Sequence, residues 1–193
     1  MEIHELYQKY LETGKVSTDT RQITTGSVFF ALKGPNFNAN EFAGEALQKG
    51  ASYAVVDDVR FVHNDRCILV DDGLKSLQAL ARYHRSQLNI PVIGLTGSNG
   101  KTTTKELASA VLSKKFKFHA TLGNLNNHIG VPLTILSIEA SHELAIVEMG
   151  ANHVGEIAAL CELANPTHGF ITNIGKAHVG MFGGFENIIR GKS

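Results

Sequence analysis

A glycine-rich segment at residues 97–103 carries the residue types that bind a triphosphate. Glycines let the backbone curl so that several N–H groups converge on phosphate oxygens, and a helix that starts directly afterwards adds its positive amino terminus. Lys101 supplies a full charge for the β- and γ-phosphates, and the Thr102 hydroxyl can ligate Mg²⁺. The standard pattern has an earlier glycine where this chain has Leu95, and a plain glycine-rich turn with a surface lysine is the alternative interpretation. The expected ATP-binding residues are Gly97, Ser98, Asn99, Gly100, Lys101, Thr102 and Thr103.

Two positions further along the chain suit the same chemistry. Glu148 follows the apolar run 144–147, and a carboxylate at the carboxyl end of a buried strand beside a phosphate loop usually faces Mg²⁺. His178 lies in a loop that we expect at the same edge of the sheet. The alternatives are a carboxylate at a surface strand end and a solvated or packed histidine, since Mg²⁺ prefers oxygen ligands.

The elements that must position these residues alternate between strand-like and helix-like segments, which favours an α/β protein. The apolar runs predict strands, and the residues with a spacing of three and four predict helices. The predicted strands are 28–32, 53–56, 67–70, 92–96, 116–119, 144–147 and 169–172, and the predicted helices are 41–49, 74–88, 102–113, 155–163 and 185 onward.

The helix at 74–88 is expected to be amphipathic, with Arg85 among the residues on its polar side. Residues 89–91 then break it, because proline cannot continue a helix. We therefore predict a small amino-terminal α/β domain over residues 1–88, and a partial P-loop domain with a doubly wound, mainly parallel sheet over residues 91–193. The chain ends inside a predicted helix without a capping signal, which suggests a fragment of a longer protein.

Composition narrows the class of protein. The 193 residues include 18 basic and 18 acidic side chains, so the basic excess typical of nucleic-acid binding is missing. No run of about 18 apolar residues predicts a membrane span, and the polar amino terminus does not resemble a signal peptide. Cys67 and Cys161 are far apart and are interpreted as buried thiols in a reducing compartment. We expect a cytoplasmic monomer.

Taken together, these motifs resemble the Mur ligases, which build the peptide of bacterial cell-wall precursors. The phosphate loop at 96–102 is similar to the family's own version, which also lacks the earlier glycine. The asparagine-rich segment at 123–132, the carboxylate segment at 148–157 and the histidine segment at 171–183 also match. Residues 19–34 resemble the family's uridine-nucleotide-binding domain, with Thr20 in place of the usual serine, and Asn38 stands where that domain usually has an acidic residue.

The resemblance implies an ATP- and Mg²⁺-dependent ligase that joins D-Ala-D-Ala to UDP-MurNAc-tripeptide through an acyl phosphate. It implies that Lys101, His178 and a carbamylated Lys192 are catalytic, and that Thr102, Glu148, His178 and Lys192 hold Mg²⁺. A plain surface lysine is the alternative for Lys192. The family's carboxy-terminal domain, which binds the incoming amine, is absent, so we expect weak binding of the UDP-sugar and little or no ligase activity. The expected substrate-binding residues are Thr20, Arg21, Lys33, Asn124, Asn126, Asn127, Asn152 and His153, although the asparagines would also suit turns.

Three other functions remain open at this point. A sister ligase would add a single amino acid to the same nucleotide. A P-loop kinase or a GTPase would share the fold, but residues 173–176 lack the guanine motif Asn-Lys-x-Asp, and arginines are sparse after Arg85. A non-catalytic uridine-nucleotide-binding module would have lost its ATP site, which is argued against by the intact Lys101, Thr102, Glu148 and His178.

Overall fold

The computed structural model describes residues 2–176 and 179–192. The chain divides into two compact units, which we call unit 1, ending at His84, and unit 2, beginning at Arg85. The boundary falls inside the helix α3 (Gly73–Gln87). His178 lies outside the described residues.

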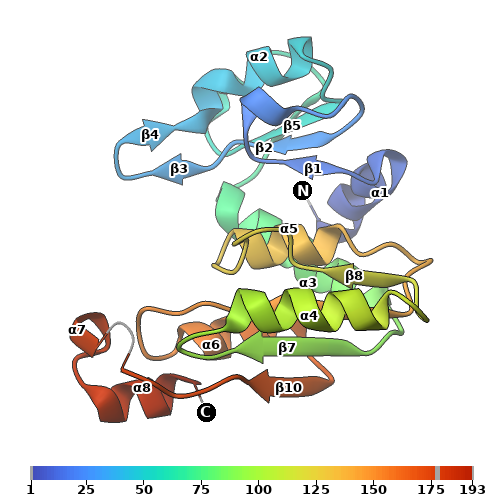
Figure 1. Ribbon diagram of the computed structural model, residues 1–193. Coiled ribbons are helices and arrows are strands. Elements are labelled where there is room, and N and C mark those ends of the chain that lie inside the picture. The colour runs from blue at the N-terminus through green and yellow to red at the C-terminus, as the bar shows by residue number, and fades with distance from the viewer. Residues whose placement is uncertain (1, 177–178, 193) are drawn as a thin grey trace. The chain divides into compact units, whose positions relative to one another are not determined.

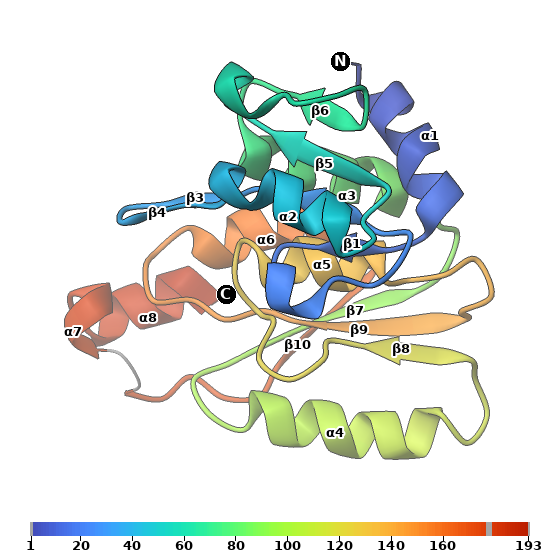
Figure 2. The same cartoon turned by 90° about the horizontal axis from the view of Figure 1, so that it is seen from above.

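Unit 1 is built on a parallel four-stranded sheet in the order β1-β2-β5-β6. Figure 1 labels the first three of these strands, and Figure 2 labels β6. Successive side chains of a strand point to opposite faces. Phe29 accordingly belongs to the core cluster that also contains Ala43 and Leu47 of α2. The elements of unit 1 before α3 are α1 (Ile3–Thr13), β1 (Val16–Ser17), η1 (Thr20–Gln22), β2 (Val28–Phe30), β3 (Lys33–Gly34), β4 (Phe37–Asn38), η2 (Ala39–Phe42), α2 (Ala43–Gln48), β5 (Tyr53–Val56), η3 (Val59–Phe61) and β6 (Cys67–Leu69).

Unit 2 contains a second parallel sheet, in the order β10-β7-β9-β8. Helix α4 covers one face of this sheet, and α5 and α6 lie on the other (Figure 2). Parallel strands with helices on both faces bring their carboxyl ends to one edge, where such sheets bind ligands. The elements are β7 (Val92–Thr96), α4 (Lys101–Leu112), β8 (Phe118–Ala120), α5 (Gly130–Leu136), β9 (Leu144–Glu148), α6 (Glu156–Ala164), β10 (His168–Ile171), α7 (Val179–Phe182) and α8 (Phe185–Lys192).

The α/β fold with parallel sheets is confirmed, and the predicted strands lie within one or two residues of those observed. Helices α1, α5 and α7 were not predicted. Helix α1 has apolar residues at Ile3, Leu6, Tyr7 and Tyr10, which is the spacing of a buried helical face. Helix α5 begins with Gly130 and contains Pro132 in its first turn, where proline costs no hydrogen bond.

The prediction for Arg85 was wrong, because this side chain is buried rather than on a polar face. Its guanidinium donates hydrogen bonds to the carbonyl oxygens of Leu88 (2.9 Å), Ala164 (2.9 Å) and Asn165 (3.0 Å). Two of these carbonyls belong to the carboxyl end of α6, where helical carbonyls lack partners within the helix. Arg85 therefore ties the end of α3 to the end of α6.

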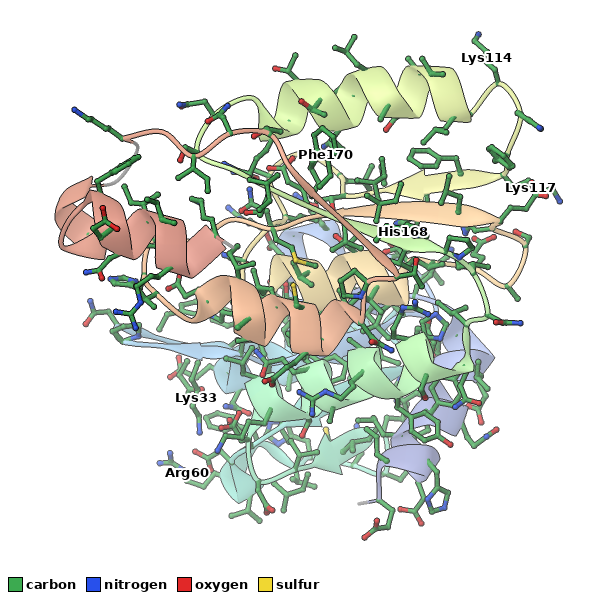
Figure 3. The ribbon with its side chains drawn as sticks, turned by 90° about the horizontal axis from the view of Figure 1, so that it is seen from below. Lys33, Arg60, Lys114, Lys117, His168 and Phe170 are labelled. Carbon is green, nitrogen blue, oxygen red and sulfur yellow. The ribbon has the colours of Figure 1, made fainter. Side chains whose placement is uncertain are left out.

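Among residues 2–176 and 179–192, strand β10 pairs with β7 alone, and it has exposed residues along its whole length, including Phe170, which Figure 3 labels. In the part of the chain that the structure describes, no helix is both long and apolar enough to cross a membrane.

Candidate nucleotide and metal site

The phosphate loop joins β7 to α4 and is held against the segment that follows β10. The Ser98 hydroxyl donates to the Gly175 carbonyl and accepts from the Gly175 N–H, both at 2.9 Å. The Asn99 carbonyl accepts hydrogen bonds from Thr172 Oγ1 (2.7 Å) and Asn173 Nδ2 (3.0 Å). These bonds give the loop a fixed shape, and they bring Ser98 and Asn99 to the edge where β7 and β10 both end.

Lys101 is the first residue of α4, so its charge and the amino terminus of that helix act at the same place. Its ammonium group donates to the carbonyl of Gly97 at 2.9 Å, which closes the loop on itself. Gly100, directly before the helix, has a φ of 78°, a conformation that residues with a side chain rarely adopt. The loop therefore presents the curled backbone and the positive charge that its sequence predicts.

Glu148 ends β9 beside this loop, in register with Leu95 of β7. Its side chain is 1% exposed. One carboxylate oxygen, Oε1, accepts hydrogen bonds from Asn126 Nδ2 (2.8 Å) and Thr102 Oγ1 (3.3 Å). The backbone N–H of Glu148 donates to Thr121 Oγ1 at 2.9 Å. The structure thus brings two of the predicted metal ligands, Thr102 and Glu148, into contact.

The donor set at Glu148 fits Mg²⁺. A buried polar atom normally has a hydrogen-bond partner. Among the described residues, however, the second carboxylate oxygen of Glu148, Oε2, is buried and has none. A carboxylate and a hydroxyl are the oxygen ligands that Mg²⁺ prefers, and it usually completes its shell with water and phosphate. In residues 2–176 and 179–192, no three His, Cys, Asp or Glu side chains gather around a common point, so a metal here would need such outside ligands.

Lys192 lies near the same site and is 3% exposed. Burial lowers the pKa of its amine, and the nearby Lys101 ammonium lowers it further. The side chain lines an apolar cavity of about 320 Å³, which Thr96 and Met149 also line, and its Nζ is 5.6 Å from the ring centre of Phe182. Lys192 is therefore not the plain surface lysine of the alternative interpretation.

The predicted asparagines have three different environments. Asn126 contacts Glu148, as described above, and its backbone carbonyl accepts a hydrogen bond from Gly150 N–H at 2.8 Å. Asn127 Oδ1 accepts from the N–H groups of Ile129 (3.0 Å) and Gly130 (2.8 Å), so this side chain supports the start of α5. Asn124 is exposed. Asn126 is thus the member of the group that contacts the candidate metal ligand Glu148.

Asn152 and His153 lie in the exposed turn before α6, and Glu156 holds both of them. Glu156 Oε2 accepts hydrogen bonds from the backbone N–H groups of Asn152 (2.7 Å) and His153 (3.2 Å). His153 Nδ1 lies 3.0 Å from Glu156 Oε1. The asparagine side chain and the outer edge of the imidazole remain at the surface, where a substrate can reach them.

In unit 1, Thr20 and Arg21 line a hollow of about 700 Å³, together with Phe37 and Phe42. The two phenylalanine rings are stacked, with centroids 5.6 Å apart. Hydrogen bonds from Arg21 lower the pKa of Asp19 to about 2. Asp19 and Glu45 also line this hollow, and the Arg21 guanidinium is paired with Asp19 at 2.6 Å. The hollow therefore offers an aromatic wall, which suits a base, beside a paired cation.

Lys33 does not line that hollow. Its ammonium group forms an ion pair with Asp57 at 2.8 Å. Asp57 also accepts a hydrogen bond from Asn40 Nδ2 at 2.7 Å. Burial works against the carboxylate form of Asp57, but these partners hold its pKa below the usual value. Lys33, labelled in Figure 3, is thus engaged within unit 1.

Lys105 is a residue of this site that the sequence prediction missed. It is 1% exposed, and its Nζ lies 4.0 Å from Glu148 Oε2. The signal that could have found it is its spacing, because a residue four positions after Lys101 lies on the same face of the helix.

Comparisons with known proteins find a family and several relatives with similar sequence and fold. The Mur ligase middle domain matches residues 95–193. The UDP-N-acetylmuramoyl-tripeptide–D-alanyl-D-alanine ligase of Bacillus subtilis is 44% identical over 181 residues, which cover 92% of this chain and 39% of that protein. The MurF structure from Acinetobacter baumannii aligns with a TM-score of 0.87 at 36% identity, covering 98% of this chain and 44% of that one.

A MurF ligase from Thermotoga maritima, solved in complex with ADP, aligns with a TM-score of 0.83 at 37% identity. The alignment covers 94% of this chain and 42% of that one. The chain thus spans less than half of the length of the relatives that it matches.

Proposed function

Because the chain belongs to the Mur ligase family, we propose that it forms the nucleotide-binding part of an ATP-dependent amide-bond ligase. The reaction would join D-Ala-D-Ala to UDP-MurNAc-tripeptide in the cytoplasm. The likeness to a UDP-N-acetylmuramoyl-tripeptide–D-alanyl-D-alanine ligase and to a MurF structure supports these substrates over those of a sister ligase.

The observation that carries the proposal is the open oxygen of Glu148. Oε2 is buried without a partner among the described residues, while Oε1 contacts Thr102 at the start of α4. A carboxylate in this state, next to a glycine-rich loop and a helix amino terminus, is suited to a metal–nucleotide complex. The relative solved with ADP supports ATP as the nucleotide.

A carboxylate does not react with an amine unaided, and phosphorylation by ATP gives it a leaving group. The residues of this chain would contribute positioning and charge neutralisation. The loop N–H groups and Lys101 would bind the β- and γ-phosphates. Thr102 and Glu148 would hold Mg²⁺, which when bound would supply positive charge at the phosphate oxygens. The amine would then displace phosphate from the acyl phosphate.

Lys192 would take part as a carbamate, which turns a cation into an oxygen ligand. A neutral amine is the form that reacts with carbon dioxide, and the lowered pKa of Lys192 favours that form. Carbon-13 NMR with labelled bicarbonate should then show a carbamate signal that disappears in Lys192→Arg. His178 is proposed as a second metal-site residue from the resemblance alone, since it lies outside the described residues.

For the uridine nucleotide, we propose the hollow in unit 1 that Thr20, Arg21, Phe37 and Phe42 line. Asn126, Asn152 and His153 would contact the sugar-peptide portion of the substrate. Asn124 remains a candidate because it is exposed, whereas the side-chain oxygen of Asn127 is already engaged at α5.

The test is calorimetric titration of the 193-residue chain with ATP, with and without Mg²⁺. The chain should bind ATP more tightly when Mg²⁺ is present. Glu148→Gln should abolish that gain while leaving metal-free binding of ATP in place. Lys101→Met should weaken ATP binding both with and without Mg²⁺. Glu162→Gln, which replaces an exposed carboxylate on α6, is the matched control and should behave as wild type. If wild-type chain binds ATP equally with and without metal, a non-catalytic module becomes the better account.

A further inference from the structure

Lys105 is a buried cation that the proposed mechanism does not use. It lies on α4, one helical turn after Lys101, with 1% of its side chain exposed. Lysine is almost never fully buried unless it is paired. What its ammonium group contacts therefore indicates what it does.

The ammonium group has three oxygen atoms near 3 Å. It donates hydrogen bonds to the carbonyl oxygens of Thr121 (2.7 Å) and Gly123 (3.1 Å), and it forms an ion pair with the Oε1 atom of Glu106 (2.9 Å). An ammonium group has three protons to donate. Glu148 Oε2, at 4.0 Å, lies beyond hydrogen-bond distance of this group, and it has no hydrogen-bond partner among the described residues.

Lys105 thus acts on Glu148 through its charge and not through a hydrogen bond. Opposite charges 4 Å apart attract strongly where water is excluded, and both side chains are 1% exposed. The ammonium group offsets the carboxylate charge, but it leaves the lone pairs of Oε2 free for another ligand. The carboxylate of Glu106 offsets the charge of Lys105 only in part, because the Glu106 side chain is 65% exposed and its charge is screened by solvent.

The same cation repels any metal ion that approaches Oε2. With Lys105 and Glu148 cancelling each other, a nucleotide-free site offers little net negative charge to Mg²⁺. The phosphates of ATP would bring the missing charge, together with further oxygen ligands. We propose that Lys105 is a positioning residue that makes metal binding at Glu148 depend on nucleotide. This inference rests on the proposed function, since it takes Glu148 as a metal ligand.

The experiment is titration of the nucleotide-free chain with Mg²⁺, and with Mn²⁺ followed by electron paramagnetic resonance. Lys105→Met removes the charge and leaves an unbranched apolar side chain one atom shorter, so it should bind either metal at least about tenfold more tightly than wild type. Lys105→Arg keeps the charge and should bind as wild type. Lys114→Met is the matched control, because Lys114 lies exposed just beyond the other end of α4 (Figure 3).

A second measurement separates this role from simple support of the fold. Lys105→Met leaves a buried carboxylate uncompensated, so its melting temperature should fall and Mg²⁺ should restore part of the loss. Adding Glu148→Gln should abolish that rescue. If Lys105→Met does not fold, Lys105→Gln takes its place with the same expectations, because its amide can still donate to the Thr121 carbonyl.

Unchanged metal affinity in a folded Lys105→Met or Lys105→Gln chain would overturn the inference, and so would weaker affinity. The proposed function would survive either result if wild-type chain still binds ATP more tightly with Mg²⁺. Loss of that metal-dependent gain in wild type would instead count against the proposed function itself.

Discussion

Replacing Gly97 by alanine should damage the phosphate loop far more than the same change at Gly100. Gly97 has a φ of 145°, and a Cβ there would overlap Thr172 Oγ1 and lie 3.1 Å from the Thr172 backbone nitrogen. Gly100 has a φ of 78°, and no described atom lies within 4 Å of a Cβ placed there. Both variants strain the backbone, but only Gly97→Ala adds a collision.

The expected size of each effect follows from these contacts. A residue with a side chain in left-handed geometry costs about 1–2 kcal/mol, which is the whole effect expected for Gly100→Ala. At Gly97, relieving the collision means moving Thr172, whose hydroxyl donates to the Asn99 carbonyl at 2.7 Å. Losing that bond costs about 1 kcal/mol, and overpacking costs about 1–3 kcal/mol. Gly97→Ala should therefore lower the free energy of unfolding of unit 2 by about 3–6 kcal/mol.

The assay can follow the two units separately. The chain has no tryptophan, and its four tyrosines (Tyr7, Tyr10, Tyr53 and Tyr83) all lie in unit 1. Tyrosine fluorescence during urea unfolding therefore reports unit 1, whereas circular dichroism reports both units. Gly97→Ala should shift the dichroism transition of unit 2 to lower urea and leave the fluorescence transition in place.

The double variant Gly97→Ala/Thr172→Ala is the control for the collision, because it removes the overlapping Oγ1 atom. It should recover part of the stability lost in Gly97→Ala. The reasoning about Thr172 would be refuted if the two single glycine variants lost equal stability, or if the double variant were no more stable than Gly97→Ala.

Three further outcomes are expected. Arg85→Met should lower the free energy of unfolding of unit 2 by about 3 kcal/mol, because three carbonyl oxygens lose a charged donor. Urea unfolding followed by circular dichroism measures this change, and a loss below about 1 kcal/mol would contradict the role given to Arg85. Burial and the charge of His142 lower the pKa of His119, so the folded state prefers the neutral ring and its stability should be fully present above the unfolded pKa of 6.5 and fall as the pH drops below it. Thermal melts between acid and neutral pH should show a smaller fall of the melting temperature with pH in His119→Gln than in wild type. Gly130→Ala should disorder the asparagine-rich segment, because its Cβ would lie 2.5 Å from the Cα atom of Leu125; faster hydrogen exchange there with no change in unit 1 is the expected result.

Local chemistry explains what the sequence could predict. A phosphate loop is specified by residues that lie next to one another, between an apolar strand and a helix. Gly97 and Gly100 set its backbone geometry, and a lysine and a hydroxyl follow directly. The carboxylate at the end of β9 follows the same logic, because parallel strands end at one edge of a sheet. These residues are close in sequence or follow one repeating pattern. Their placement therefore needed no knowledge of distant contacts.

Contacts between distant segments explain what was missed. Lys105 and Arg85 are basic residues, which are usually exposed, and their burial depends on carbonyl oxygens 16–80 residues away. No periodicity shows where such acceptors lie. The role of Asn126 at Glu148 depends on how the segment before α5 folds back. Helix α5 itself was hidden because Gly130 and Pro132 resemble loop residues.

The hydrogen bond from Lys101 to the Gly97 carbonyl also bears on how tightly a nucleotide can bind. A long flexible side chain loses up to about 2 kcal/mol of rotamer entropy when it is immobilised. In this loop the loss has already occurred on folding, because the ammonium group rests on its own turn at 2.9 Å. An arriving polyphosphate would exchange one acceptor for several stronger ones without having to order the lysine. Ordering of Lys101, which carries most of the positive charge of the loop, should consequently add little entropic penalty to polyphosphate binding.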